Sequence, residues 1–152
     1  MFHYSDILMA MRQATVRSED PGLASQPTGP RGSTTVQRVL AVAAHPDDLE
    51  QLCGGTLARY ARDGHVVTMC TVALGDRGSY VESRDSTAAR RSMESRSAAA
   101  RLGAELIQLD VPDGEIDDHD PALVKRMVDA VRTANPDVVI THNRACFRSA
   151  IT

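Results

Sequence analysis

Between residues 36 and 141 the chain contains four short apolar runs, separated by stretches of helical character. The runs occupy residues 36–43, 65–72, 104–109 and 137–141. None of them keeps a consistently polar face, which is typical of strands that are buried on both sides. Helices are predicted at about 49–62, 86–102 and 121–133. This alternation predicts an α/β fold, a Rossmann-like parallel sheet with helices on both faces.

The chain divides into three parts by composition. Its 152 residues, of which 42% are hydrophobic, supply one core of ordinary size. Residues 1–35 are rich in turn-forming residues and poor in core residues, so we predict a flexible leader there. Residues 36–143 form the predicted domain, and residues 144–152 a divergent tail.

Charge and cysteine content exclude several classes of protein. The formal net charge is -3, and acidic and basic residues are mixed along the sequence, so we do not expect a nucleic-acid partner. The three cysteines form no C-x-x-C pair, which argues against a disulfide framework and favours a cytoplasmic location. No apolar run reaches the roughly 18 residues of a membrane span. A homo-oligomer is compatible with the sequence.

A histidine and two aspartates follow the first apolar run directly, within residues 44–50 (AHPDDLE). Ligands of parallel sheets bind at the carboxyl ends of the strands. A catalytic zinc ion has about three protein ligands, commonly histidine and carboxylate, and one open position. We therefore predict that His45 and Asp48 bind a metal and that Asp47 acts as general base. The alternative is a solvated loop in which an aspartate caps the next helix.

Several motifs together resemble those of the LmbE/PIG-L family of zinc-dependent N-deacetylases. AHPDD-x-E at residues 44–50 and CGGT at residues 53–56 resemble the hallmark of that family. GDRGS at residues 75–79, R-x-x-E at residues 91–94 and L-x-x-PDG at residues 109–114 resemble its later motifs, in the same order. The resemblance implies a hydrolase that uses Zn²⁺ to remove the acetyl group from an N-acetylglucosamine-type conjugate, its small-molecule partner.

The resemblance also implies a role for individual residues. His45 and Asp48 match the zinc ligands of the family, Asp47 matches the general base, and Arg91 and Asp113 match substrate contacts. Two of these positions have ordinary structural alternatives. Arg91 could pair with the glutamate three positions on, and Asp113 could be a turn residue before a glycine.

The chain departs from the family pattern after the fourth apolar run. The family has a His-Pro-Asp-His type segment there, whose last histidine supplies the third zinc ligand. Here Thr141-His142-Asn143 is followed by RACFRSAIT. We therefore expect a domain that is incomplete relative to the family, truncated at its C-terminus, and the alternative function is a non-catalytic fragment that lacks the third ligand. His142 is either a replacement ligand or a structural residue at the strand end.

The sequence disfavours two other functional sites, a second metal site and a nucleotide-binding loop. Asp117, Asp118 and His119 combine carboxylates with an imidazole, but their place before a helix favours a solvated acidic cap over a second metal site. A nucleotide-binding Rossmann domain is disfavoured, because His-Pro-Asp-Asp stands where G-x-G-x-x-G would be and two aspartates repel a pyrophosphate.

Overall fold

The computed structural model describes residues 35–142. Its elements are β1 (Arg38–Ala43), α2 (Asp48–Arg62), β2 (Val66–Ala73), α3 (Arg84–Leu102), β3 (Glu105–Val111), α4 (Pro121–Ala134) and β4 (Val138–Thr141). Every strand and helix predicted from the sequence is present, and its bounds lie within two residues of those predicted. The predicted leader, up to residue 34, and the predicted tail lie outside the described residues.

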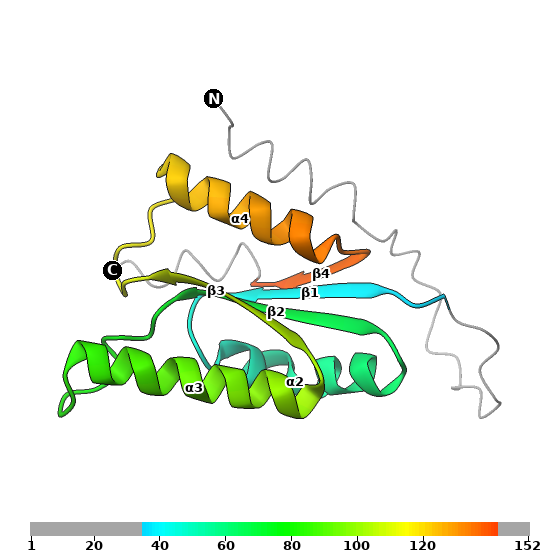
Figure 1. The fold of residues 1–152 in the computed structure, drawn as a ribbon, viewed down its shortest axis with the longest axis horizontal. Coiled ribbons are helices and arrows are strands. Elements are labelled where there is room, and N and C mark those ends of the chain that lie inside the picture. Colours follow the sequence, from blue (N-terminus) through cyan, green and yellow to red (C-terminus); the bar gives the residue numbers. More distant parts are fainter. Residues whose placement is uncertain (1–34, 143–152) are drawn as a thin grey trace.

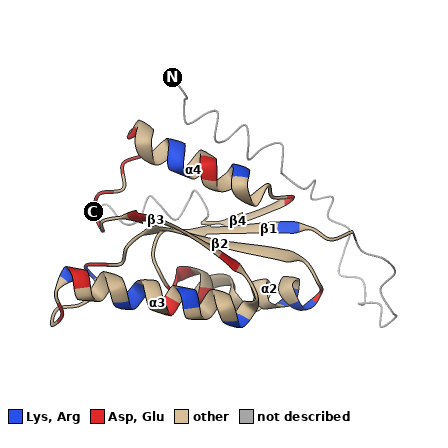
Figure 2. Ribbon diagram, in the orientation of Figure 1, with Lys and Arg blue, Asp and Glu red and all other residues tan. Residues whose placement is uncertain are grey.

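The four strands form one parallel sheet in the order β3-β2-β1-β4. Helices α2 and α3 cover one face of this sheet, and α4 covers the other (Figure 1). The predicted α/β fold with helices on both faces is therefore confirmed. Figure 2 shows that charged residues concentrate on the helices and loops, as a sheet with two buried faces requires.

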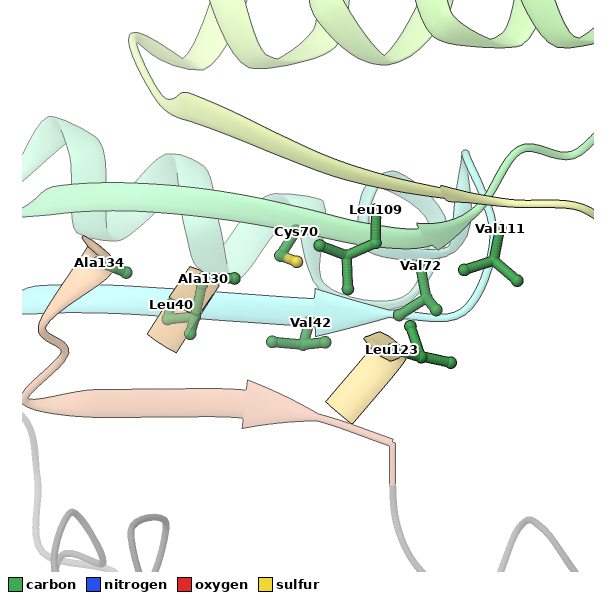
Figure 3. Close-up of a cluster of buried hydrophobic side chains, with 9 residues drawn as sticks. All are labelled: Leu40, Val42, Cys70, Val72, Leu109, Val111, Leu123, Ala130 and Ala134. Carbon is green, nitrogen blue, oxygen red and sulfur yellow. The ribbon is translucent and has the colours of Figure 1, made fainter. Parts of the chain in front are cut away.

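Successive residues of β1 pack alternately into two separate hydrophobic cores. Leu40 and Val42 point to the α4 side, where they pack in a cluster with Cys70, Val72, Leu109, Val111, Leu123, Ala130 and Ala134 (Figure 3). Val39, Ala41 and Ala43 join the cluster beneath α2 and α3. A strand with this double role must be apolar throughout, which explains the unbroken run in the sequence. Burial raises the pKa of the Cys70 thiol to about 11, as expected for a core thiol.

The order of the strands creates a switch point at the carboxyl end of β1. The chain adds β2 and β3 on one side of β1 and then crosses over to place β4 on the other side. The loops that follow β1 and β4 therefore leave neighbouring strands in different directions, and a crevice forms between them in folds of this kind. The loop after β1 contains the His-Pro-Asp-Asp segment, and His142 follows β4 directly.

Candidate active site

The segment between β1 and α2 forms a tight turn around a buried proline. Pro46 is fully buried, whereas the side chain of His45 is half exposed. Asp47 occupies the N-cap position of α2 in the left-handed conformation, with φ 91° and ψ -23°, and its side chain makes no capping hydrogen bond. The capping alternative therefore does not describe Asp47. The turn leaves the carboxylates of Asp47 and Asp48 free to take different partners.

One carboxylate oxygen, Oδ2 of Asp48, lies close to two imidazoles. It accepts a hydrogen bond from the backbone N–H of His45 at 2.9 Å and lies 3.8 Å from Nδ1 of the same residue. Nε2 of His142, at the end of β4, lies 3.6 Å from the same oxygen. The switch point thus brings together donor atoms from residues 94 positions apart in the sequence.

His45, Asp48 and His142 offer nitrogen and oxygen donors of the kinds that zinc binds. Nitrogen and oxygen ligands of a tetrahedral zinc ion lie about 3.4 Å apart, since the metal–ligand bonds are about 2.0–2.2 Å long. The separations of 3.8 Å and 3.6 Å bring each histidine close to that value from Asp48, but among the described residues only Asp117, Asp118 and His119 have three donor atoms all within 4.8 Å of one another. Nε2 of His142 also accepts a hydrogen bond from the N–H of Ala44 at 3.2 Å, so binding a metal through this nitrogen requires that hydrogen bond to be exchanged for the metal.

The carboxylate of Asp47 is bound by an arginine of α3. Its Oδ2 accepts a hydrogen bond from Nη2 of Arg91 at 2.6 Å, and the same nitrogen donates to the carbonyl oxygen of Pro46 at 3.2 Å. Nη1 of Arg91 donates to Glu94 at 2.9 Å. The pairing of Arg91 with Glu94 that the helical spacing indicated is therefore present, and Arg91 contacts Asp47 in addition.

Asp113 lies in the turn after β3 and binds the loop after β2. Its two carboxylate oxygens accept hydrogen bonds from the backbone N–H groups of Gly75, at 2.9 Å, and Arg77, at 3.0 Å. Its own N–H donates to Asp76 at 2.8 Å. The carboxylate of Asp113 thus joins two loops at the same edge of the sheet as the histidines.

Asp76 is a buried carboxylate whose role the sequence motifs left unassigned. Besides the Asp113 N–H, it binds Nε of Arg84 at 2.8 Å. The hydrogen bond from the Asp113 backbone, together with the nearby Arg84 and Arg77 charges, lowers the pKa of Asp76. The sequence signal was the position of Asp76 in the GDRG loop, directly beyond the end of a buried strand.

The cluster of Asp117, Asp118 and His119 lies in a different loop, between β3 and α4. All three residues are exposed, although their donor atoms lie within 4.8 Å of one another. The imidazole lies 2.7 Å from Asp118, and the backbone N–H of His119 donates to Asp117. The N-cap of α4 is the next residue, Asp120, whose carboxylate accepts two backbone N–H groups. This cluster is a solvated surface feature, and we assign it no site.

Similar proteins of known structure share this fold. GalB, the 4-carboxy-2-hydroxymuconate hydratase from Pseudomonas putida KT2440, superposes with a TM-score of 0.64 at 25% identity, over 70% of this chain and 47% of that one. The N,N'-diacetylchitobiose deacetylase from Pyrococcus horikoshii superposes with a TM-score of 0.63 at 28% identity, over 68% of this chain and 39% of that one.

Sequence comparison identifies a deacetylase relative and the family of the chain. The 1D-myo-inositol 2-acetamido-2-deoxy-alpha-D-glucopyranoside deacetylase of Actinosynnema mirum is 40% identical over 46% of this chain and 28% of that protein. The chain thus spans about a quarter of the length of this relative. The sequence profile described as PIG-L, GlcNAc-PI de-N-acetylase, matches residues 40–147, from within β1 to beyond β4. Since that profile matches well over half of the chain, the protein belongs to the PIG-L (LmbE-like) family.

Proposed function

We propose that this protein is a zinc-dependent hydrolase that removes the acetyl group from an N-acetylated amino sugar conjugate. The observation that carries the proposal is the cluster at the switch point, where one carboxylate oxygen of Asp48 lies 3.8 Å from the imidazole of His45 and 3.6 Å from that of His142. Membership of the PIG-L family and the deacetylase relatives support the choice of reaction.

We assign the metal to His45 and Asp48, with His142 as the third donor. When bound, zinc supplies an electrophile for the acetyl carbonyl and acidifies a water molecule. Asp47, next to the ligands in sequence, accepts a proton from the attacking water and returns it to the departing amine. The products are acetate and the free amino sugar.

The substrate class comes from the relatives, because the fold alone hosts more than one reaction. GalB is a hydratase on this fold, whereas the Pyrococcus horikoshii protein is a deacetylase. The more similar Actinosynnema mirum relative is a deacetylase named for an acetamido-deoxyglucoside of inositol. We therefore propose an N-acetylglucosamine-type conjugate as substrate, with Asp113 as the substrate contact that family resemblance implies.

The test is an acetate-release assay combined with elemental analysis. The full chain is purified with zinc and incubated with the N-acetylglucosaminide of inositol and with N,N'-diacetylchitobiose, and acetate and free amine are quantified. We expect stoichiometric zinc and release of both products in equal amounts. His45→Ala removes a ligand and should lose zinc together with activity, whereas Asp47→Asn should keep zinc and lose activity. Asp118→Asn, in the solvated surface cluster, is the matched control and should match the wild type.

The opposite result would favour the alternative function, a non-catalytic fragment. A well-folded chain that holds no zinc and releases no acetate from either substrate would refute the proposed reaction. Acetate release that survives His45→Ala would instead refute the assigned metal site.

Location and assembly stay predictions. The described residues contain no helix that is long and apolar enough to cross a membrane. The cytoplasmic location rests on the cysteines, of which Cys53 and Cys70 are both free thiols. A homo-oligomer remains compatible with the fold, and light scattering of the full chain tests it.

A further inference from the structure

We propose that Arg91 is a positioning residue that fixes the general base Asp47, instead of a residue that binds substrate. The inference rests on the proposed function for the role of Asp47, but its structural part stands on the contacts of Arg91 alone. It differs from the role that family resemblance implies for this arginine.

The first argument is that protein groups occupy or bury the guanidinium of Arg91. Nη2 donates to both the Pro46 carbonyl and the Asp47 carboxylate, and Nη1 donates to Glu94. Nε is buried and has no hydrogen-bond partner among the described residues. An arginine that recognises a substrate carboxylate or sugar presents its fork of N–H groups outward. Arg91 turns its fork to the loop after β1 instead.

The second argument is that Asp47 needs to be held in place. A non-glycine residue with φ 91° is uncommon and persists only where its surroundings impose it. The side chain of Asp47 makes no capping bond that would fix it within its own helix. Nη2 of Arg91 binds the carbonyl just before Asp47 and the carboxylate of Asp47 itself, so one nitrogen fixes both the backbone and the side chain.

The third argument is that Arg91 is itself held on α3. Glu94 binds both Arg91 and Arg90, at 2.9 Å each, and Arg90 also binds Glu82 at 3.1 Å. The hydrogen bonds from Arg91 and then Arg90 lower the pKa of Glu94. Gly75 packs against the stem of Arg91, since a Cβ there would lie 3.4 Å from Cγ. Ion pairs along α3 and packing against Gly75 thus hold the guanidinium of Arg91 in place beside Asp47.

A positioning role and a substrate-binding role predict different kinetics. A residue that binds substrate equally in the ground and transition states changes KM, whereas one that aligns the base changes kcat. Arg91→Met removes all three hydrogen bonds and keeps most of the apolar stem. Arg91→Lys keeps a charge, but its single ammonium lacks the planar fork. Arg96→Met is the control, because Arg96 lies exposed on the same helix and, among the described residues, hydrogen-bonds Ser92 Oγ alone, at 3.4 Å.

The experiment measures acetate release by the three variants of the full chain with zinc. We expect Arg91→Met to lower kcat by about tenfold or more while KM stays within about twofold of the wild type. Arg91→Lys should recover part of this loss, and Arg96→Met should match the wild type. A rise in KM with unchanged kcat would overturn the positioning role and restore a substrate contact.

A second readout does not depend on activity. The N–H of Gln51 donates to the carbonyl oxygen of Asp47 at 3.0 Å, so the first turn of α2 reports on how firmly Asp47 is held. Arg91→Met should speed amide hydrogen exchange in a peptide that covers residues 45–52, and Arg96→Met should not. If the wild type releases no acetate, the proposed function fails, and unchanged exchange in Arg91→Met separately overturns the positioning role.

Discussion

Gly75 and Gly55 should respond in opposite ways to the same substitution. Gly75 lies in the loop after β2 with φ +70°, and a Cβ there would lie 3.2 Å from the ring of Pro46. Gly55 lies in the interior of α2, where a Cβ would meet no atom within 4 Å. Alanine should therefore destabilise the protein at Gly75 and stabilise it at Gly55.

The sizes of the two effects follow from backbone and packing terms. The left-handed conformation costs alanine about 1–2 kcal/mol, and the close contact with the buried ring of Pro46 adds about 1 kcal/mol. Alanine also lowers the conformational entropy of the unfolded chain, which stabilises the folded protein by about 0.4–1 kcal/mol. Gly75→Ala should thus lose about 1–3 kcal/mol, while Gly55→Ala should gain about 1 kcal/mol from helix propensity.

The assay is equilibrium unfolding in urea, followed by far-ultraviolet circular dichroism at pH 7. With a slope of about 1–2 kcal/mol per molar urea, the midpoint should fall by about 1 M for Gly75→Ala and rise by about 0.5 M for Gly55→Ala. An unchanged midpoint for Gly75→Ala would refute the packing of this loop on Pro46. A lower midpoint for Gly55→Ala would show that another part of the protein closely covers this face of α2.

Three further outcomes test the fold and the site. Leu57 is fully buried on the sheet-facing side of α2, and its substitution by alanine should lower the stability of the protein by about 2–5 kcal/mol, measured by the same urea titration. The pKa of Asp76 is lowered in the folded state, so its stabilising effect is present above the ordinary aspartate value of 3.8 and is lost as pH falls through the lower, folded value. Stability measured between pH 5 and pH 2 should therefore fall more steeply for the wild type than for Asp76→Asn, and parallel curves would contradict this. Zinc at 100 times its Kd should stabilise the wild type by about 2.7 kcal/mol, and a His142→Ala variant should need a higher zinc concentration for the same shift in melting temperature, whereas equal zinc titrations would exclude His142 as a ligand.

The fold could be predicted from the sequence because each element carries a local signal. The apolar run at β1 is continuous since the strand feeds a core on each face, and Asp120-Pro121 marks the start of α4 through a cap and a proline in the first turn. The strand order had no such local signal. It follows from which helices cross over which face of the sheet, and the sequence indicates only that the strands are parallel.

The site could be predicted in part. The motif after β1 identified the candidate ligands, because His-Pro-Asp-Asp at a strand end is a local pattern. The contact between His142 and the loop after β1 spans 98 residues, and that between Arg91 and Asp47 spans 44. Such contacts depend on the strand order and on the rotation of α3 about its axis, neither of which the spacing of residues determines. His142 lies near Asp48 only because β4 pairs with β1 on the side opposite β2.

The backbone conformation of Asp47 explains how two adjacent aspartates acquire different partners. In an ordinary helix start, Asp47 would cap α2 with an extended backbone, as Asp120 caps α4 with φ -69° and ψ 112°. The value of φ 91° at Asp47 instead turns its carboxylate toward Arg91, while Asp48 folds back so that its Oδ2 accepts the N–H of His45. α2 thereby gives up a stabilising cap, worth about 1 kcal/mol in other helices. One carboxylate is thus held by α3 and the other lies near two imidazoles, so the residue proposed as base and the residue proposed as ligand have different partners.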